Sequence, residues 1–498
     1  PTSTRQVSRQ RQMCIRDSTI MNPKSILNLF SVLILFFSFS FVFPIFISII
    51  FNDDAFYIFL KTFISVSLIG VVGLILTRNI NNELSQKDGF VIIVMFWIVL
   101  SFAGSIPFYL SGMSIIDSFF ESMSGITTTG ATVISNIDAL PESILFYRQM
   151  LQWMGGMGLI VLAIAVMPLL GIGGGQIYKT EIPGAMGEQR LTPRIKETAQ
   201  ALWSIYLGLT IVCALLYYLG GMSLFDAVSH AMSTVAIGGF STHNESIGYF
   251  NSTTIEIICI VFMLLSAFSF TLHYFAIYRR KPLKYFYDPE FRFFFSILLL
   301  VLIVSFLINL LSNSENGPSY KEIVFHSVAM ITTTGFSISD TSNWPLSISF
   351  LLLIGAFIGA CSGSVGGGVK SWRVMIMLNH AYSNIMKIIH PNSVISLKIG
   401  SRSVDDEVAT SVWGFFSIYV ISFMILLLAV LTSGLDLESA FSAVGACLNN
   451  LGPGLGVVSE NYSNLGAFTK STLAFAMLLG RLEIFTLLVI LTPMFWAK

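Results

Sequence analysis

Four short turns, each ending in a glycine, carry the residues best suited to chemistry in this 498-residue sequence. The stretches that end at Gly130, Gly239, Gly335 and Gly452 read ESMSGITTTG, HAMSTVAIGG, HSVAMITTTG and AVGACLNNLG. Glycine lets a backbone aim successive carbonyl oxygens at one axis, and a ring of carbonyls can replace the hydration shell of a cation, as in potassium-selective filters. None of the four turns contains a carboxylate, which argues against a calcium or sodium filter built from acidic rings. The pattern predicts a carbonyl-lined cation pathway.

Each turn follows an apolar segment that is too short to cross a bilayer. The four segments lie near 115–129, 224–237, 321–334 and 437–449. A helix of about 13–15 residues spans only about 20–22 Å. An acidic residue stands 13 positions before the glycine in three copies and 14 positions before it in the fourth; these residues are Asp117, Asp226, Glu322 and Glu438. One such turn alone would more often be a helix C-cap, but four in register predict re-entrant half-helices whose irregular turns line a cavity.

Composition places the chain in a lipid bilayer. Of its residues, 54% are hydrophobic and only 11% are charged, against roughly 25% charged in an ordinary soluble domain. A helix needs about 20 apolar residues to cross the hydrocarbon. Ten stretches qualify, at roughly 26–50, 55–77, 89–112, 148–172, 200–220, 255–278, 292–312, 345–369, 408–433 and 471–497. The sequence predicts an all-α integral membrane protein with four membrane–pore–membrane repeats around a central ion pore, preceded by two extra transmembrane helices.

Charge distribution predicts the orientation of these spans. Lys+Arg and Asp+Glu are equal at 27 each, so net charge favours no nucleic-acid partner. The loops after the second, fourth, sixth and eighth spans hold sixteen lysines and arginines, whereas the alternate loops hold four, at Lys61, Arg148, Lys321 and Lys470. Because basic residues concentrate on the cytoplasmic side, we expect both termini in the cytoplasm and all four turns open to the outside.

The repeat also predicts the organisation of the chain. Residues 1–20 carry four arginines but no apolar span, and we interpret them as a disordered or non-native leader. The remaining units are an N-terminal helix pair at 21–80 and four repeats, at 81–175, 176–282, 283–390 and 391–498.

Other functional classes lack support in the sequence. The five cysteines show no CxxC spacing, and neither a GxxxxGK[ST] phosphate loop nor an HExxH motif is present. The spans contain no His/Asp/Ser or metal constellation, so the sequence predicts a protein that is not an enzyme and has no covalently bound cofactor. The alternative is a broken-helix secondary transporter for another cation or a small solute such as ammonium or sodium. That class predicts two inverted halves, whereas four parallel copies occur here.

The eighth predicted span is interrupted by five glycines within 359–368. Each glycine costs a helix about 1 kcal/mol relative to alanine, so the helix is expected to break below the turns and to line the pathway. A glycine-rich packing surface between helices is the alternative. Arg481 is the one basic residue well inside a predicted span, which suggests a functional role. The alternative role for Arg481 is an ion pair with Glu483 or with a loop carboxylate that only fixes helix packing.

A family resemblance is carried by six stretches. They are the turns TTTGAT, IGGFSTH, TTTGFS and NNLGPGLG, with GACSGSVGGGVKSWR at 359–373 and GRLEIFTLLVIL at 480–491. Together they resemble the TrkH branch of the Trk/Ktr/HKT superfamily of potassium transporters, over about 21–498. The resemblance implies potassium uptake across the bacterial inner membrane through a selectivity filter. The filter residues would be Thr128, Thr129, Gly130, Ile237, Gly238, Gly239, Thr333, Thr334, Gly335, Asn450, Leu451 and Gly452.

The same resemblance implies a gate and partners. The intramembrane gating loop would contain Gly359, Gly363, Gly366, Gly367, Gly368 and Lys370, with Arg481 as a positive charge barrier in the pore. A homodimer with one pore per subunit is implied, together with a cytoplasmic TrkA-like ring that binds the nucleotide, ATP/ADP or NAD(H). The basic loops 173–200, 278–292 and 370–408 are candidates for docking that ring, or they simply set topology.

Overall fold

The computed structural model describes residues 23–78, 86–166, 195–312, 317–342, 344–392, 397–400 and 402–496. The predicted leader and most of the predicted docking loop 173–200 lie outside these ranges. The described residues are almost entirely helical, and six helices are individually long and apolar enough to cross a membrane. The predicted all-α integral membrane class is therefore confirmed.

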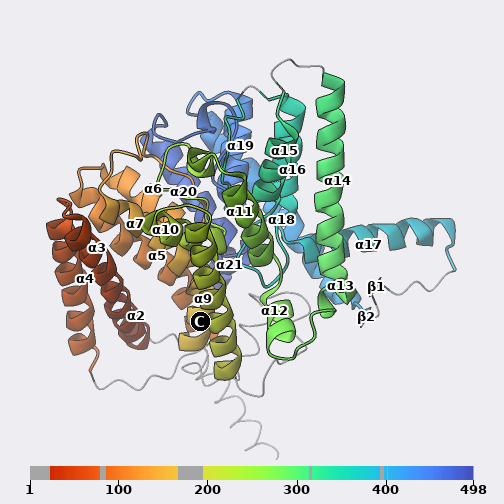
Figure 1. Ribbon diagram of the computed structural model, residues 1–498. Coiled ribbons are helices and arrows are strands. Elements are labelled where there is room, and N and C mark those ends of the chain that lie inside the picture. Colours follow the sequence, from red (N-terminus) through yellow and green to blue (C-terminus); the bar gives the residue numbers. More distant parts are fainter. Residues whose placement is uncertain are drawn as a thin grey trace, which may run out of the picture.

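An N-terminal helix pair stands at one edge of the molecule (Figure 1). Its first span consists of α2 (Pro23–Ser38), η1 (Phe39–Phe41) and α3 (Val42–Phe51), and its second span is α4 (Phe56–Leu76). Asn52 ends α3 in the left-handed conformation. Asp53 then accepts hydrogen bonds from the backbone N–H groups of Ala55 and Ser143, which ties the connection between the two spans to the first repeat.

Four units follow, each with a long helix, a half-helix and a second membrane helix. The first contains α5 (Gln86–Leu110), α6 (Ile115–Ile126) and α7 (Glu142–Val166). The second contains α9 (Ile195–Leu219), α10 (Leu224–Val235), η2 (Ser246–Phe250), α11 (Thr253–Ala267) and α12 (Phe270–Ile277). The third contains α14 (Pro289–Ser312), α15 (Tyr320–Ile331) and α16 (Leu346–Ile358). The fourth contains α18 (Asp406–Leu431), α19 (Leu437–Leu448), η3 (Gly456–Val458), α20 (Ala467–Arg481), α21 (Phe485–Leu491) and α22 (Pro493–Trp496).

The half-helices α6, α10, α15 and α19 each contain 12 residues. Their N-caps all stand 16 positions before the turn glycine: Ser114, Ser223, Ser319 and Asp436. A capping side chain accepts a backbone N–H that would otherwise lack a partner. In the fourth unit the cap itself is acidic and accepts from the N–H of Ser439, which explains why the aligned acid, Glu438, falls one position out of register.

Two large apolar clusters make the core. One joins the N-terminal pair to the first and fourth units, and the other joins the second and third units with residues of the fourth. Each cluster includes residues from the turns, among them Ile126 and Ala131 in the first and Ile237 and Leu451 in the second. The turns are therefore built into the packed interior.

Several of the ten predicted spans differ in shape or bounds from the helices that the structure describes. Span 255–278 is the pair α11 and α12 bent by 99°, and span 471–497 is the pair α20 and α21 bent by 113°. Helix α7 begins at Glu142, before the predicted start at 148, and is described only to Val166. Helix α16 is only 13 residues long and ends at Ile358, where the glycine-rich stretch begins.

The two bends have identifiable causes. At the first bend, the N–H of Cys361 donates to the carbonyl of Ala267, and the N–H of Phe270 donates to the carbonyl of Gly363. The glycine-rich loop thus replaces the helical partners of these groups. At the second bend, Glu483 and Ile484 adopt left-handed φ values of 51° and 60°. Neither bend is marked by glycine or proline, so the sequence contained no breaker to predict it.

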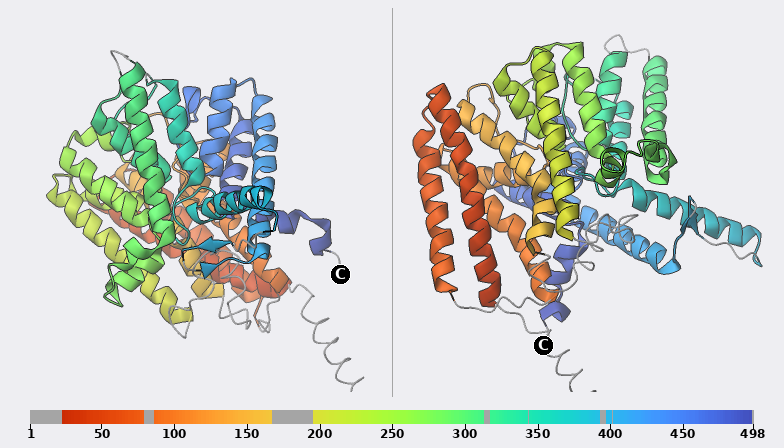
Figure 2. Two further views of the ribbon diagram at one scale, coloured as in Figure 1. Left: turned by 90° about the vertical axis from the view of Figure 1, so that its right-hand side faces the viewer. Right: turned by 60° about the horizontal axis from the view of Figure 1, so that its bottom comes forward.

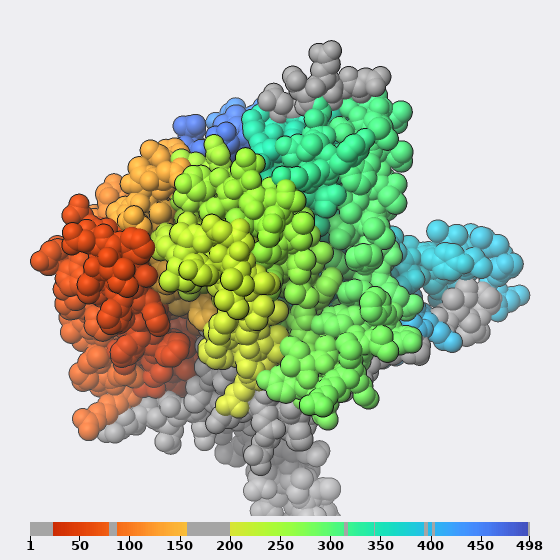
Figure 3. All heavy atoms as spheres, in the orientation of Figure 1, coloured from red at the N-terminus to blue at the C-terminus, as the bar shows by residue number. Residues whose placement is uncertain are grey.

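Helix α17 (Ser371–Ile389) projects sideways from the bundle (Figure 2). A small antiparallel hairpin, β1 (Lys398–Ile399) with β2 (Arg402–Ser403), follows α17 in the chain. The short helix α13 (Lys284–Tyr287) lies earlier, in the connection between the second and third units. Figure 3 shows the projecting segment standing clear of the main body. The predicted docking segment 370–408 therefore begins with an extended arm.

Candidate functional site: a ring of four turns

The four turns share one unusual backbone conformation. The second residue before each glycine has a left-handed φ, at 56° for Thr128, 53° for Ile237, 62° for Thr333 and 52° for Asn450. The glycines also have positive φ, at 83°, 79°, 79° and 100° for Gly130, Gly239, Gly335 and Gly452. Left-handed φ in a β-branched residue is a genuine outlier, and such strain clusters at functional sites. The same strained pattern at four places indicates a shared role.

The turns also touch one another in a closed cycle. A Cβ atom placed on Gly130 would lie 2.3 Å from the carbonyl oxygen of Gly238, and one on Gly239 would lie 2.0 Å from that of Thr334. The third contact pairs Gly335 with the oxygen of Leu451 at 2.2 Å, and the fourth pairs Gly452 with that of Thr129 at 2.6 Å. Each turn therefore presents its last carbonyl before the glycine to the neighbouring turn, and the fourth turn closes on the first. All twelve predicted filter residues lie in this ring.

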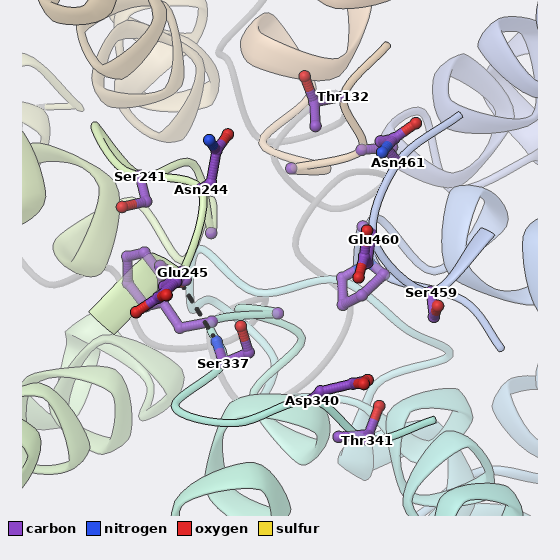
Figure 4. A pocket seen from close by; sticks show the side chains of 18 of the residues that line it. Thr132, Ser241, Asn244, Glu245, Ser337, Asp340, Thr341, Ser459, Glu460 and Asn461 are labelled. Atoms are coloured by element: carbon purple, nitrogen blue, oxygen red, sulfur yellow. Dashed lines mark hydrogen bonds between the residues drawn. The ribbon is translucent and has the colours of Figure 1, made fainter. Parts of the chain in front are cut away.

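A vestibule with a volume of about 480 Å³ opens on one side of the ring. All four units line it, as Figure 4 shows. The labelled residues are Thr132, Ser241, Asn244, Glu245, Ser337, Asp340, Thr341, Ser459, Glu460 and Asn461. Carboxylates at the mouth of such a cleft raise the local concentration of cations. The vestibule can therefore deliver cations to the ring.

Side chains brace the turns from behind. Hydroxyl pairs join Thr127 to Thr129 and Thr332 to Thr334, each at 2.8 Å. The amide of Asn450 donates to the hydroxyl of Thr129 at 3.0 Å, so it links the fourth turn to the first. These contacts hold the predicted residues rigidly, and rigid positioning is what a binding ring requires.

A buried ion pair that the sequence did not predict supports the segments that follow the first two turns. The charge distribution predicts Arg148 as a loop residue, but it lies on α7. Its side chain is completely buried, and its Nε lies 2.8 Å from Oε1 of the equally buried Glu121. Arg148 also donates to the carbonyl of Ser241, and Glu121 accepts from the N–H of Val133. The available signal was an ionisable residue at the edge of an apolar span, which by default suggests a functional or structural site.

The predicted helix break lies directly beneath the ring. Gly359 has a φ of 73°, and α17 begins only at Ser371. The N–H of Gly367 donates to the hydroxyl of Thr333 at 2.7 Å, and the N–H of Gly368 donates to the carbonyl of Asn449 at 3.2 Å. Lys370 donates to the carbonyl of Gly366, within the loop itself. Gly367 and Gly368 thus meet the underside of the third and fourth turns, whereas the carbonyl of Gly363 accepts from the N–H of Phe270 on α12.

Arg481 bridges three parts of the pathway. Its guanidinium donates to the Thr128 hydroxyl at 3.2 Å, to the Val365 carbonyl at 3.1 Å and to the Gly155 carbonyl at 2.8 Å. It therefore touches the first turn, the glycine-rich loop and α7 at once. Glu483, the alternative partner considered from the sequence, forms an ion pair with Arg373.

His243 follows the second turn and contacts two carboxylates, those of Asp138 and Asp226. Its ring lies between Asp138 at 2.9 Å and Asp226 at 3.4 Å, and it stacks on Tyr249 with centroids 3.5 Å apart. Burial alone would lower the pKa of His243, but hydrogen bonds and charge from the two carboxylates outweigh burial, so its pKa is raised above the ordinary 6.5. The protonated form thus joins the segments that follow the first and second turns.

We expect this contact to make stability depend on pH. Because the pKa of His243 is raised on folding, its stabilisation is fully present below pH about 6.5 and is lost as the pH rises through the raised value. Between about pH 6 and pH 8 the thermal unfolding midpoint of the native protein should therefore fall relative to that of His243→Gln. An equal pH dependence in both proteins would contradict the assignment.

Comparison with known proteins identifies the family. A family model described as TrkH, a cation transport protein, matches residues 55–498. The chain belongs to the TrkH family. It is 49% identical over 482 residues to the Trk system potassium uptake protein TrkH of Halomonas elongata, and 43% identical over 483 residues to that of Escherichia coli; each alignment covers 96% of this chain and all of the relative.

A solved structure also resembles the chain closely. The crystal structure of the potassium transporter TrkH from Vibrio parahaemolyticus matches with a TM-score of 0.87 and 45% sequence identity, covering 96% of this chain and all of the other. The TrkH family resemblance read from the turns, the glycine-rich loop and the last span is therefore confirmed. The relatives are named as transport proteins, which agrees with the expectation that the chain is not an enzyme.

Proposed function

We propose that this protein takes up potassium across the cytoplasmic membrane, with the four-turn ring as its selectivity filter. The observation that carries the proposal is the closed cycle in which each turn glycine faces the last carbonyl of the next turn. Backbone carbonyls replace the hydration shell of potassium in filters of this kind. The names of the relatives, Trk system potassium uptake proteins, support the choice of ion.

Growth of a bacterial strain that lacks its own potassium uptake systems tests this function. Expression of the protein should restore growth at low potassium, and cells should accumulate potassium or its analogue rubidium. Restored growth that depends on ammonium or sodium instead of potassium would contradict the proposal and favour the broken-helix secondary transporter. Potassium currents through single purified molecules in planar bilayers would further distinguish a channel from an ion-coupled symporter.

We further propose that the loop 359–370 gates the pathway, with Arg481 as a charge barrier beneath the ring. The contacts of Arg481 with Thr128 and Val365 support this role, because one guanidinium reaches both the filter and the loop. A fixed positive charge on the pathway slows cation entry. Loss of the charge would relieve this repulsion.

Arg481→Ala should therefore raise the initial rate of rubidium uptake several-fold in potassium-starved cells. Arg481→Lys is the matched control, because it keeps the charge but not the fork of donors, and its rate should stay close to that of the native protein. An unchanged rate in Arg481→Ala, at equal amounts of protein in the membrane, would remove the charge barrier from the proposal.

The remaining assignments concern orientation and assembly. The sixteen-to-four distribution of basic residues supports cytoplasmic termini and a vestibule that opens outward. A homodimer and a TrkA-like nucleotide-binding ring are proposed from the family resemblance. The projecting helix α17 supports a docking role, because its apolar residues Leu378, Tyr382, Ile385 and Ile388 are more than half exposed, at 55%, 63%, 56% and 79%. The mass of the purified protein, alone and with the partner ring, tests both assemblies.

A further inference from the structure

The second turn lacks the side chains that brace the other three. The first and third turns have hydrogen-bonded threonine pairs, and the fourth has the amide of Asn450. The corresponding residues of the second turn, at 236–238, read Ala-Ile-Gly and carry no hydroxyl or amide. Its strained backbone, with a left-handed φ at Ile237, must therefore be held by groups from elsewhere.

Gln152, on α7 of the first unit, supplies the missing support. Its Oε1 accepts from the N–H of Phe240 at 3.1 Å and from the hydroxyl of Ser233 at 2.6 Å. Because a backbone N–H can only donate, these contacts fix the orientation of the amide. Its Nε2 then donates to the carbonyl of Gly238 at 2.6 Å. This carbonyl is the one that the second turn contributes to the ring.

Gly238 and Gln152 are also complementary in shape. A Cβ atom on Gly238 would meet the amide of Gln152, with Cδ at 2.3 Å, Oε1 at 2.4 Å and Nε2 at 2.8 Å as its nearest neighbours. The φ of Gly238 lies outside the left-handed region, so its backbone would accept a side chain. The equivalent positions in the other turns, Thr129, Thr334 and Leu451, do carry one. The amide of Gln152 occupies the space that a side chain at 238 would fill.

We infer that Gln152 is a positioning residue that sets how the ring discriminates between cations. This inference rests on the proposed potassium filter. A carbonyl that already accepts a short hydrogen bond is held in one direction and offers less electron density to an ion. Selectivity depends on the number, field strength and flexibility of the coordinating carbonyls. The carbonyl of Gly238 accepts a hydrogen bond from a side chain, and no hydrogen bond among the described residues reaches the corresponding carbonyls of Thr129, Thr334 and Leu451, so the ring is unequal.

Gln152→Met tests the electronic part of the inference, because methionine keeps the volume of the side chain but cannot donate to Gly238. We expect the ratio of potassium to sodium uptake to change about fivefold, as for the loss of one hydrogen bond, while the maximal potassium rate changes less than about twofold. Gln149→Met is the matched control: Gln149 lies on the same helix and is equally buried, but its amide has no hydrogen-bond partner among the described residues. A ratio equal to the native one in Gln152→Met would overturn the inference.

A steric rescue tests the complementarity without any transport measurement. Gly238→Ala should lower the unfolding midpoint of the purified protein, because its Cβ collides with Gln152. The double variant Gly238→Ala with Gln152→Ala should lose less stability than the sum of the losses in the two single variants, because the collision is absent once the amide is removed. A loss equal to that sum would overturn the complementarity. If the native protein fails to carry potassium, the proposed filter falls and the selectivity role falls with it; if the native protein carries potassium and only the ratio in Gln152→Met stays unchanged, this inference alone falls.

Discussion

Gly130→Ala is expected to abolish potassium uptake. The new Cβ would stand 2.3 Å from the carbonyl oxygen of Gly238, a distance that Cβ atoms essentially never show, and the obstacle is backbone that also belongs to the ring. The two turns would have to separate, which breaks the cycle of carbonyls. We expect uptake of rubidium to fall to the level of cells without the protein, even when the variant reaches the membrane in normal amounts.

Gly434→Ala is the matched control for this experiment. Gly434 has the same φ of 83° as Gly130, but a Cβ there meets no atom within 4 Å. Both variants therefore suffer the same left-handed strain, about 1 kcal/mol, and only Gly130→Ala suffers the collision. Comparable loss of uptake in the two variants would mean that backbone strain, and not ring closure, explains the glycines.

Arg148→Met is expected to destabilise the protein severely. It leaves the carboxylate of Glu121 buried without its counter-charge, a situation that costs about 3–5 kcal/mol. Arg148 also donates to the carbonyl of Ser241 beyond the second turn, so uptake should fail together with folding. The measurements are the amount of monodisperse protein after extraction and its unfolding midpoint.

Adding Glu121→Gln to Arg148→Met should restore part of the stability. Glutamine removes the uncompensated charge and keeps an acceptor for the N–H of Val133. Lys321→Ala provides a comparison, because Lys321 is 48% exposed although its partner Glu256 is only 6% exposed. Water reaches one side of this pair, so we expect a smaller loss of stability than in Arg148→Met. A wild-type midpoint in Arg148→Met would show that the buried pair is dispensable.

The parts of the fold that were predictable are those that repeat. Each turn glycine stands 16 positions after the N-cap of its half-helix, so aligning the glycines located the half-helices within a few residues. The acidic residue of the fourth copy fell out of register because Asp436 took over the N-cap that serine occupies elsewhere. Local chemistry of this kind varies between copies without changing the helix.

The parts that escaped prediction depend on distant contacts. The bend between α11 and α12 is made by backbone groups of Cys361 and Gly363, almost one hundred residues further along the chain. Likewise, Gln152 and Gly238 are in contact although 86 positions separate them in the sequence. No motif next to either residue predicts this contact. A polar residue four positions after Arg148 in an apolar helix was the one available signal. This spacing indicated that one face of α7 points into the protein, but it did not indicate which groups that face contacts.

The order of contacts in the ring also has a consequence for biosynthesis. Neighbouring turns meet in chain order, but the last contact joins Gly452 to the carbonyl of Thr129 in the first unit. Synthesis proceeds from the N-terminus. The first three turns are therefore made before the fourth, and until then the ring lacks the contacts of the fourth turn with the first and third turns. The carbonyl ring is therefore complete only when the fourth unit has been synthesised, and the folding of the first turn stays coupled to the last quarter of the chain.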